Sequence, residues 1–316
     1  MRKLSFVIPC YRSEHTIETV VEELIETVQK RKDYDYEVIL VNDYSPDKVW
    51  DVIRKLCMEN SRIKGINLAR NFGQHAAVMA GYRACSGELI ISLDDDGQTP
   101  VDEVYRLIDK IDEGYDVVFA EYDTIKQNIF RRFGTFMNDM MMRTMLQKPK
   151  NIKTNSYCVA RKFVIDEVLR YGNSYPFVVG LILRTTRKIA DVKVKHRKRI
   201  EGESGYTFRS LLKLWFNGFT TFSEKPLRIA TILGLVCALL GFGYSVYIVV
   251  RKLLYPEIIL MGYSSLMAVL LFIGGMLMLL LGIIGEYVGR IYITLNNAPQ
   301  YVVRDVINVK QEETQL

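Results

Sequence analysis

The stretch ELIISLDDDGQTP, residues 88–100, sets the expectation for the fold. Its first six residues have the pattern of a buried strand, which ends abruptly in three aspartates and a glycine. Pro100 then fits the first turn of a following helix. Similar apolar runs alternate with helical spacing over the first 120 residues, at 4–9, 37–41, 63–68 and 116–120. This alternation with short connections predicts an α/β domain around a mostly parallel, doubly wound sheet.

The bulk composition restricts the class of protein. The chain has 316 residues, a formal net charge of +6 and five cysteines. The cysteines have no CxxC spacing and no histidine partners at metal-like intervals, so we expect reduced, mostly buried thiols in the cytosol. No signal-peptide pattern precedes the first strand. Basic residues cluster before the apolar C-terminal region, which favours anionic lipid over an ordinary solvated surface, and we expect no nucleic-acid partner.

The C-terminal third of the chain has a different composition. Residues 229–250 and 264–284 are apolar without a charge and long enough to span a bilayer, although a buried helical hairpin is the alternative. The amphipathic stretch before them, 206–222, predicts a helix along the membrane interface or one packed on the soluble domain. We therefore expect four parts: a cytosolic domain, 1–205; a juxtamembrane helix, 206–228; a two-helix transmembrane hairpin, 229–290 (about 229–250 and 264–288); and a cytosolic tail, 291–316.

Polar segments follow three of the predicted strands, at residues 9–14, 42–47 and 94–98. Ligands of open parallel sheets bind beyond the carboxyl ends of the strands. Three aspartates at one strand end repel one another unless a cation is present, and their oxygens suit Mg²⁺ or Mn²⁺. The alternative is an Asp-rich turn that caps the next helix. No glycine-rich phosphate loop occurs, so a diphosphate would rely on a metal and on basic residues such as 196–199, unless that run is a membrane-facing charge patch.

Taken together, the motifs resemble a known family. The chain is similar to the family 2 glycosyltransferases of GT-A type, specifically the polyisoprenyl-phosphate glycosyltransferases. These include dolichyl-phosphate mannose synthase and the bacterial enzymes that load glucose or aminoarabinose onto undecaprenyl phosphate. The resemblance covers nearly the whole chain. The segments that carry it are VIPCYRSE (7–14), VNDYSPD (41–47), RNFGQHAAVMAGY (70–82), LDDDGQTP (93–100), HRKRIEGESGYTF (196–208) and GEYVGRIY (285–292).

The resemblance implies a role for each matching donor-site residue. Asp43 would contact the donor nucleoside. Asp94 and Asp96 would form the DxD pair, which would bind the diphosphate through Mg²⁺ or Mn²⁺. Asn71 and Gly73 lie in a segment near the donor, where His75 is as readily structural. The implied donor-binding residues are Pro9, Tyr11, Glu14, Asp43, Asp94 and Asp95; the implied metal ligands are Asp96 and Gln98.

The resemblance also implies residues for the acceptor and for catalysis. Acceptor phosphate would be held by a basic segment after the fifth strand, and Arg199 and Ser204 match positions that meet the donor phosphate or the acceptor. Acceptor-phosphate residues are Lys126, Arg131, Thr135 and Ser204, and the implied catalytic residues are Asp94, Asp96, Arg131 and Arg199.

Several positions depart from the family pattern. The usual Asn after Tyr11 is Arg12, and the usual Gly after Asp43 is Tyr44. Asp95 and Gly97 replace a small residue and a Leu in the metal motif, and Gly205 replaces a Lys or similar residue. These departures affect the expected identity of the nucleotide base and of the sugar more than the expected type of reaction. The QxxRW motif of processive synthases does not occur in the sequence, which predicts a single transfer.

The predicted activity is transfer of one sugar, with inversion, from a nucleotide sugar (UDP-linked by our choice) to undecaprenyl phosphate. An acceptor phosphate monoester is largely dianionic at neutral pH and needs no protein base. The product would be a lipid-linked sugar for cell-envelope glycan modification. The resemblance also implies a homo-oligomer, a tetramer, in the bacterial inner membrane with a cytosolic catalytic domain. Alternatives are an anchored glycosyltransferase with a glycan or protein acceptor, and a non-catalytic scaffold.

Overall fold

A computed structural model describes residues 1–122, 139–140, 142–143, 148–149, 151–195, 225–254, 262–296 and 298–309. The chain forms two compact units. The first comprises Met1–Leu211 together with Asn297–Leu316, and the second comprises Leu212–Asn296. The first six residues of the predicted tail, 291–296, therefore belong to the second unit, and the rest of that tail belongs to the N-terminal unit.

The first unit contains an eight-stranded mixed sheet with the order β7-β5-β6-β4-β1-β2-β3-β8. The neighbours β1–β2, β2–β3, β1–β4 and β5–β7 are parallel, whereas β6 and β8 pair antiparallel, which confirms the mostly parallel sheet. Because β3 and β4 lie on opposite sides of β1, the strand order reverses at β1. The strands are β1 (Arg2–Cys10), β2 (Tyr34–Asn42), β3 (Ile63–Leu68), β4 (Leu89–Ser92), β5 (Val117–Tyr122), β6 (Cys158–Arg161), β7 (Ile189–Val194) and β8 (Val303–Ile307).

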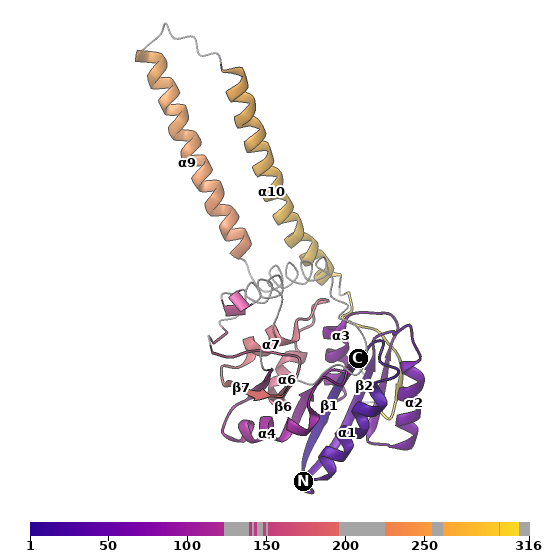
Figure 1. The fold of residues 1–316 in the computed structure, drawn as a ribbon. Helices are drawn as coiled ribbons and strands as arrows, with labels where there is room; N and C mark the ends of the chain where they lie inside the picture. The colour runs from indigo at the N-terminus through magenta and orange to yellow at the C-terminus, as the bar shows by residue number, and fades with distance from the viewer. Residues whose placement is uncertain are drawn as a thin grey trace. The chain divides into compact units, whose positions relative to one another are not determined.

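Helices cover both faces of this sheet (Figure 1). One face carries α1 (Ile17–Gln29), α2 (Val49–Glu59), the 3₁₀ turn η1 (Val101–Glu103) and α4 (Val104–Asp112), whose apolar sides join one buried core with the strands. The other face carries α3 (Gln74–Arg83), α6 (Lys162–Leu169) and α7 (Val178–Thr185). Helix α3 lies so close to the sheet that a Cβ atom at Gly81 would come within 2.4 Å of the Val7 side chain. Helices on both faces explain the uninterrupted apolar strands in the sequence.

The strand β8 is an addition that the sequence analysis did not predict. It pairs antiparallel with β3 at the edge of the sheet. Before it, the Gln300 side chain donates to the carbonyl oxygens of Tyr171 and Asn173. After it, the Asn308 side chain donates to the carbonyl oxygens of Cys57 and Ile63, both at 2.8 Å. The residues at 298–309 are thus part of the folded domain.

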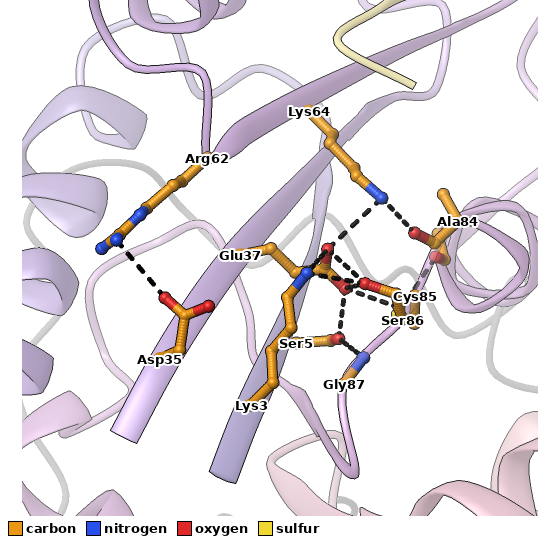
Figure 2. A network of polar contacts seen from close by, with 11 residues as sticks. Lys3, Ser5, Asp35, Glu37, Arg62, Lys64, Ala84, Cys85, Ser86 and Gly87 are labelled. Atoms are coloured by element: carbon orange, nitrogen blue, oxygen red, sulfur yellow. Dashed lines mark hydrogen bonds and ion pairs between the residues drawn. The ribbon is translucent and has the colours of Figure 1, made fainter. Parts of the chain in front are cut away.

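A charged network occupies the amino edge of the sheet (Figure 2). Glu37, 2% exposed, accepts hydrogen bonds from Ser5 Oγ and from the Ser86 amide, both at 2.6 Å. Its carboxylate also pairs with Lys3 Nζ at 2.9 Å and with Lys64 Nζ at 3.3 Å. These contacts join β1, β2, β3 and the loop between α3 and β4, so the network links four segments that are far apart in the sequence.

The second unit contains two long helices, α9 (Lys225–Leu254) and α10 (Tyr263–Leu295), which contact each other (Figure 1). Many of their large apolar side chains are exposed, including Phe242, Leu240 and Met278. Among the described helices, one is long and apolar enough to cross a membrane, with its apolar window at Phe272–Gly289; α9 contains a shorter apolar run, Gly234–Tyr244. Helix α10 extends seven residues past the predicted end of the second span at 288.

Candidate functional site

The loops after β1, β2 and β4 meet at the carboxyl edge of the sheet. The Tyr11 amide donates to Asp95 Oδ2 at 2.9 Å, and Thr16 Oγ1 donates to the Asp95 carbonyl oxygen at 2.7 Å. The Asp43 amide donates to the Cys10 carbonyl oxygen at 3.1 Å. These contacts lie where the strand order reverses, which is where open α/β sheets bind ligands. The structure therefore brings the three predicted segments together.

Asp43 is buried, at 3% exposure, and its carboxylate organises the loop before α3. It accepts hydrogen bonds from the amides of Phe72 at 2.7 Å and Gly73 at 2.9 Å. Asn71 Nδ2 donates to the Asp43 carbonyl oxygen at 3.1 Å. Burial raises the pKa of Asp43, although the two backbone hydrogen bonds act in the opposite direction. The predicted donor-site segment containing Asn71 and Gly73 is thus in direct contact with Asp43.

Glu14 joins the loop after β1 to the loop after β2. Its amide donates to Asp47 Oδ2 at 3.0 Å, and its Oε2 accepts from the Lys48 amide at 2.8 Å. Pro9 is buried near the end of β1, and the exposed Tyr11 lies just after the strand, in the connection to α1. The four residues predicted to line the nucleoside pocket therefore lie together at the carboxyl edge of the sheet: Pro9, Tyr11, Glu14 and Asp43.

The three aspartates after β4 have different partners. Asp94 accepts from Gln74 Nε2 at 2.9 Å and from Ser156 Oγ at 2.6 Å. Asp95 accepts from the Tyr11 amide, and Asp96 accepts from the Gln98 amide at 3.0 Å in a tight turn. Gly97 has φ of +72°, a conformation that favours glycine and that a leucine would adopt only with strain. The departure at Gly97 therefore follows from the shape of this turn.

Electrostatics at this edge disfavour negative charge. Burial is the main cause that raises the pKa of Asp95 to about 6; the neighbouring Asp94 contributes to this rise, and the hydrogen bond from the Tyr11 amide opposes it. Burial is also the main cause that raises the pKa of Tyr122 to about 12, and Asp94 and Asp96 contribute to this rise. A cation near these carboxylates would stabilise their ionised forms.

The metal-ligating atoms that the protein offers suit a hard divalent cation only in part. Carboxylates of the aspartate turn and the Gln98 amide supply oxygen, the ligand type of Mg²⁺ and Mn²⁺. Among the described residues, however, no group of three His, Cys, Asp or Glu side chains converges as a ready-made metal site. An ion here would need further ligands from phosphate oxygens, as is usual for Mg²⁺ bound through one or two carboxylates. The residues fit an ion that binds together with a diphosphate.

The acceptor-side predictions fall elsewhere. Five of the predicted residues lie outside the described part of the chain: Lys126, Arg131, Thr135, Arg199 and Ser204.

Two partners of Asp94, Gln74 and Ser156, were not predicted from the sequence. Gln74 lies in a quoted motif, whereas no pattern marks Ser156. Burial lowers the pKa of His75 to about 4, and its ring packs edge-on against Phe177, which supports a structural role.

Both parts of the chain match described families. Residues 5–170 match "Glycosyl transferase family 2". The chain belongs to glycosyltransferase family 2. Residues 225–291 of this family 2 glycosyltransferase match the "GtrB C-terminal hairpin". The apolar helices α9 and α10 correspond to that hairpin.

Similar proteins span almost the whole chain. The uncharacterized glycosyltransferase YkcC of Bacillus subtilis is 33% identical over 309 residues, which cover 98% of this chain and 95% of that protein. The undecaprenyl-phosphate 4-deoxy-4-formamido-L-arabinose transferase of Proteus mirabilis is 32% identical over 317 residues, covering 98% and 96%. The corresponding Klebsiella pneumoniae transferase is 33% identical over 320 residues, covering 99% and 96%.

Solved structures share the fold of this family 2 glycosyltransferase. Glucosyl-3-phosphoglycerate synthase of Mycobacterium tuberculosis, in complex with Mn²⁺, UDP and glucosyl-3-phosphoglycerate, has a TM-score of 0.52 at 16% identity over 70% of this chain and 78% of that one. The complex of the same enzyme with Mn²⁺, UDP-glucose and phosphoglyceric acid has a TM-score of 0.51 over the same shares. The GT-A-like fold expected from the resemblance is confirmed.

Proposed function

We propose that this family 2 glycosyltransferase transfers one sugar from a nucleotide sugar to undecaprenyl phosphate or a closely related polyisoprenyl phosphate. The product would be a lipid-linked sugar that serves cell-envelope glycan modification. The observation that carries the proposal is the similarity of both units, sheet domain and hairpin together, to one undecaprenyl-phosphate sugar transferase over 98% of the chain. UDP is the proposed nucleotide.

The carboxyl edge supports the proposed donor site. Asp43, with Pro9, Tyr11 and Glu14, would line the nucleoside pocket, because these residues share one edge at the reversal of strand order. Asp94 and Asp95 would face the donor diphosphate. Asp96 and Gln98 would hold Mg²⁺ or Mn²⁺, which when bound supplies positive charge to the departing diphosphate.

The proposed reaction is a single displacement. An oxygen of the acceptor phosphate dianion attacks the anomeric carbon, the bond from that carbon to the nucleoside diphosphate breaks, and the configuration inverts. No proton has to be removed from the acceptor, because the second pKa of a phosphate monoester is about 6. Lys126, Arg131 and Thr135, with Arg199 and Ser204, are proposed to hold the acceptor phosphate and to offset its repulsion from the donor.

The hairpin supports a membrane location. Two helices with many exposed large apolar side chains are expected to lie in an apolar surrounding rather than in water. We propose that α9 and α10 both cross the bacterial inner membrane, with the sheet domain on the cytosolic face. A homo-oligomer, a tetramer, is part of the same proposal.

The full-length protein in detergent should decide the acceptor class. It would be incubated with undecaprenyl phosphate, Mn²⁺ or Mg²⁺ and a panel of nucleotide sugars, and the organic extract analysed by mass spectrometry. The expected result is one glycosyl phosphate lipid whose mass equals acceptor plus sugar. Transfer to a glycan or protein instead of the lipid would overturn the acceptor assignment, and the absence of any nucleotide-sugar turnover across the panel would favour a scaffold.

A further inference from the structure

A row of polar residues crosses three strands beside the candidate donor site. Asn42 of β2, Asn67 of β3 and Asp305 of β8 occupy paired positions in the sheet. Asn67 Nδ2 donates to Asp305 Oδ2 at 2.8 Å, and Asn42 Nδ2 donates to Asn67 Oδ1 at 2.8 Å. Asn42 and Asn67 are buried, at 4% and 8% exposure, so their amide groups depend on these partners.

The row continues into the loops of the donor site. Asn42 Oδ1 accepts from the Ser45 amide at 3.0 Å, and Ser45 Oγ accepts from the Arg12 amide at 2.7 Å. Tyr44 and Arg12, with φ of +51° and +57°, lie in the left-handed region that residues other than glycine enter at a cost. Such conformations persist where the surrounding contacts impose them. The hydrogen bonds of Ser45 are contacts of this kind.

A second contact joins the C-terminal segment to the same site. The Ala69 amide donates to the Val302 carbonyl oxygen at 2.8 Å. Ala69 begins the connection whose later residues, Phe72 and Gly73, donate their amides to the Asp43 carboxylate. The segment around β8 therefore supports the loops after both β2 and β3.

We propose that β8 is a positioning element for the nucleotide-sugar donor. Asp305 and Asn67 act as positioning residues, which fix Asn42 and through it the loop of Tyr44 and Ser45. This inference rests on the proposed function, because it assumes that the nucleoside binds at those loops. Its consequence is that the segment following the hairpin in sequence sets donor affinity without touching the donor.

The opposite end of β8 supplies a matched control. Asn308 donates to the carbonyl oxygens of Cys57, near the end of α2, and of Ile63, at the start of β3, both away from the donor loops. Its φ is +59°, which glycine tolerates, so Asn308→Gly removes these two hydrogen bonds without adding strain. Asn308→Gly tests whether β8 matters only as an edge strand, whereas Asp305→Ala and Asn67→Ala interrupt the polar row.

The experiment measures steady-state kinetics of the full-length enzyme, with donor and acceptor varied separately, and the Kd of the free nucleoside diphosphate by calorimetry. We expect Asn67→Ala to raise the donor KM about 10-fold and Asp305→Ala about 3-fold, since water can replace the half-exposed Asp305 in part. The acceptor KM and kcat should change less than about 2-fold. Asp305→Asn, which retains an acceptor oxygen for Asn67, should restore the donor KM.

The outcomes distinguish a failure of the positioning role from a failure of the proposed function. Asn308→Gly should lower the midpoint of thermal unfolding and leave the donor KM unchanged. A donor KM that is unchanged in Asp305→Ala and in Asn67→Ala, while the wild type transfers sugar, would overturn the positioning role alone. The same holds if Asn308→Gly raises the donor KM as much as Asp305→Ala does. A wild type that binds and turns over no nucleotide sugar would overturn the proposed function and this inference with it.

Discussion

The two edges of the sheet handle buried negative charge in opposite ways. At the amino edge, burial raises the pKa of Glu37, but hydrogen bonds from Ser5, Ser86 and Lys3 and the charge of Lys64 lower it to about 2. At the carboxyl edge, burial raises the pKa of Asp43 and that of Asp95, the latter to about 6, against hydrogen bonds from backbone amides. At the amino edge, side chains and amides of the chain itself offset the cost of burying the carboxylate. At the carboxyl edge, part of that electrostatic cost remains, and a bound cation would reduce it.

The largest expected effect tests the chemistry of the carboxyl edge. Asp96→Asn keeps an oxygen that can accept from the Gln98 amide but removes the charge proposed to hold the metal. We expect kcat to fall about 100- to 1,000-fold, the size typical of losing one electrostatic contribution to the transition state. Transfer would be measured by mass spectrometry of the lipid product, with thermal unfolding as a control for folding. Near-normal transfer by Asp96→Asn would remove Asp96 from the proposed metal site.

The amino edge should respond in stability and not in activity. Glu37→Gln leaves Lys64, whose side chain is 10% exposed, without its buried counter-charge, and removing one partner of a buried pair costs about 3–5 kcal/mol. The free energy of unfolding should fall by about 3 kcal/mol, while kcat per folded molecule stays unchanged. A matched double variant, Glu37→Gln with Lys64→Met, should recover part of the loss. A loss of kcat at unchanged stability would contradict the contrast between the edges.

The pH dependence of stability should have opposite signs at the two edges. Glu37 has a folded pKa of about 2 against 4.5, so its contribution is present above pH 4.5 and is lost as the pH falls toward 2, by about 3 kcal/mol. Asp95 has a folded pKa of about 6 against 3.8, so its ionisation lowers stability as the pH rises from 3.8 to 6. Midpoints of thermal unfolding would be compared for wild type, Glu37→Gln and Asp95→Asn across this range.

The outcomes differ in direction. The stability deficit of Glu37→Gln should shrink as the pH falls below 4.5, and the stability of Asp95→Asn relative to wild type should increase as the pH rises toward 6. Parallel pH profiles for wild type and Asp95→Asn would show that the Asp95 carboxylate carries no electrostatic cost in the folded protein.

Much of the fold and the location of the candidate donor site at the carboxyl edge could be predicted from local pattern. Apolar runs that end in polar segments define parallel strands, and parallel strands place their carboxyl ends at one edge, which brings Asp43 and the aspartate turn together. The hydrogen-bond partners toward which the three aspartate side chains point could not be predicted. They depend on Gln74, Ser156 and the Tyr11 amide, which come from other elements.

The strand β8 and the Glu37 network could be predicted only by knowing which segments far apart in the sequence become neighbours in the fold. Residues 303–307 are a short run after a long apolar helix, and Asn67 and Asp305 are 238 positions apart. Glu37 begins the apolar run 37–41, and nothing in that run indicates that Ser5 and Ser86 will surround it. Local pattern predicts which residues form an edge of the sheet, but the partners that neutralise a charge there depend on which strands become neighbours.

The smallest expected effect concerns the left-handed residues of the carboxyl edge. Tyr44→Gly and Arg12→Asn replace side chains at φ of +51° and +57° by residues that adopt this region more readily. Relief of strain is offset in part by the entropy of glycine in the unfolded chain, so each should raise the free energy of unfolding by about 1 kcal/mol or less. Tyr175→Gly, at another exposed tyrosine without a positive φ, is the control and should lower it. If Tyr44→Gly destabilises as much as Tyr175→Gly does, Tyr44 is not strained, and the hydrogen bonds of Ser45 have no unfavourable conformation to impose.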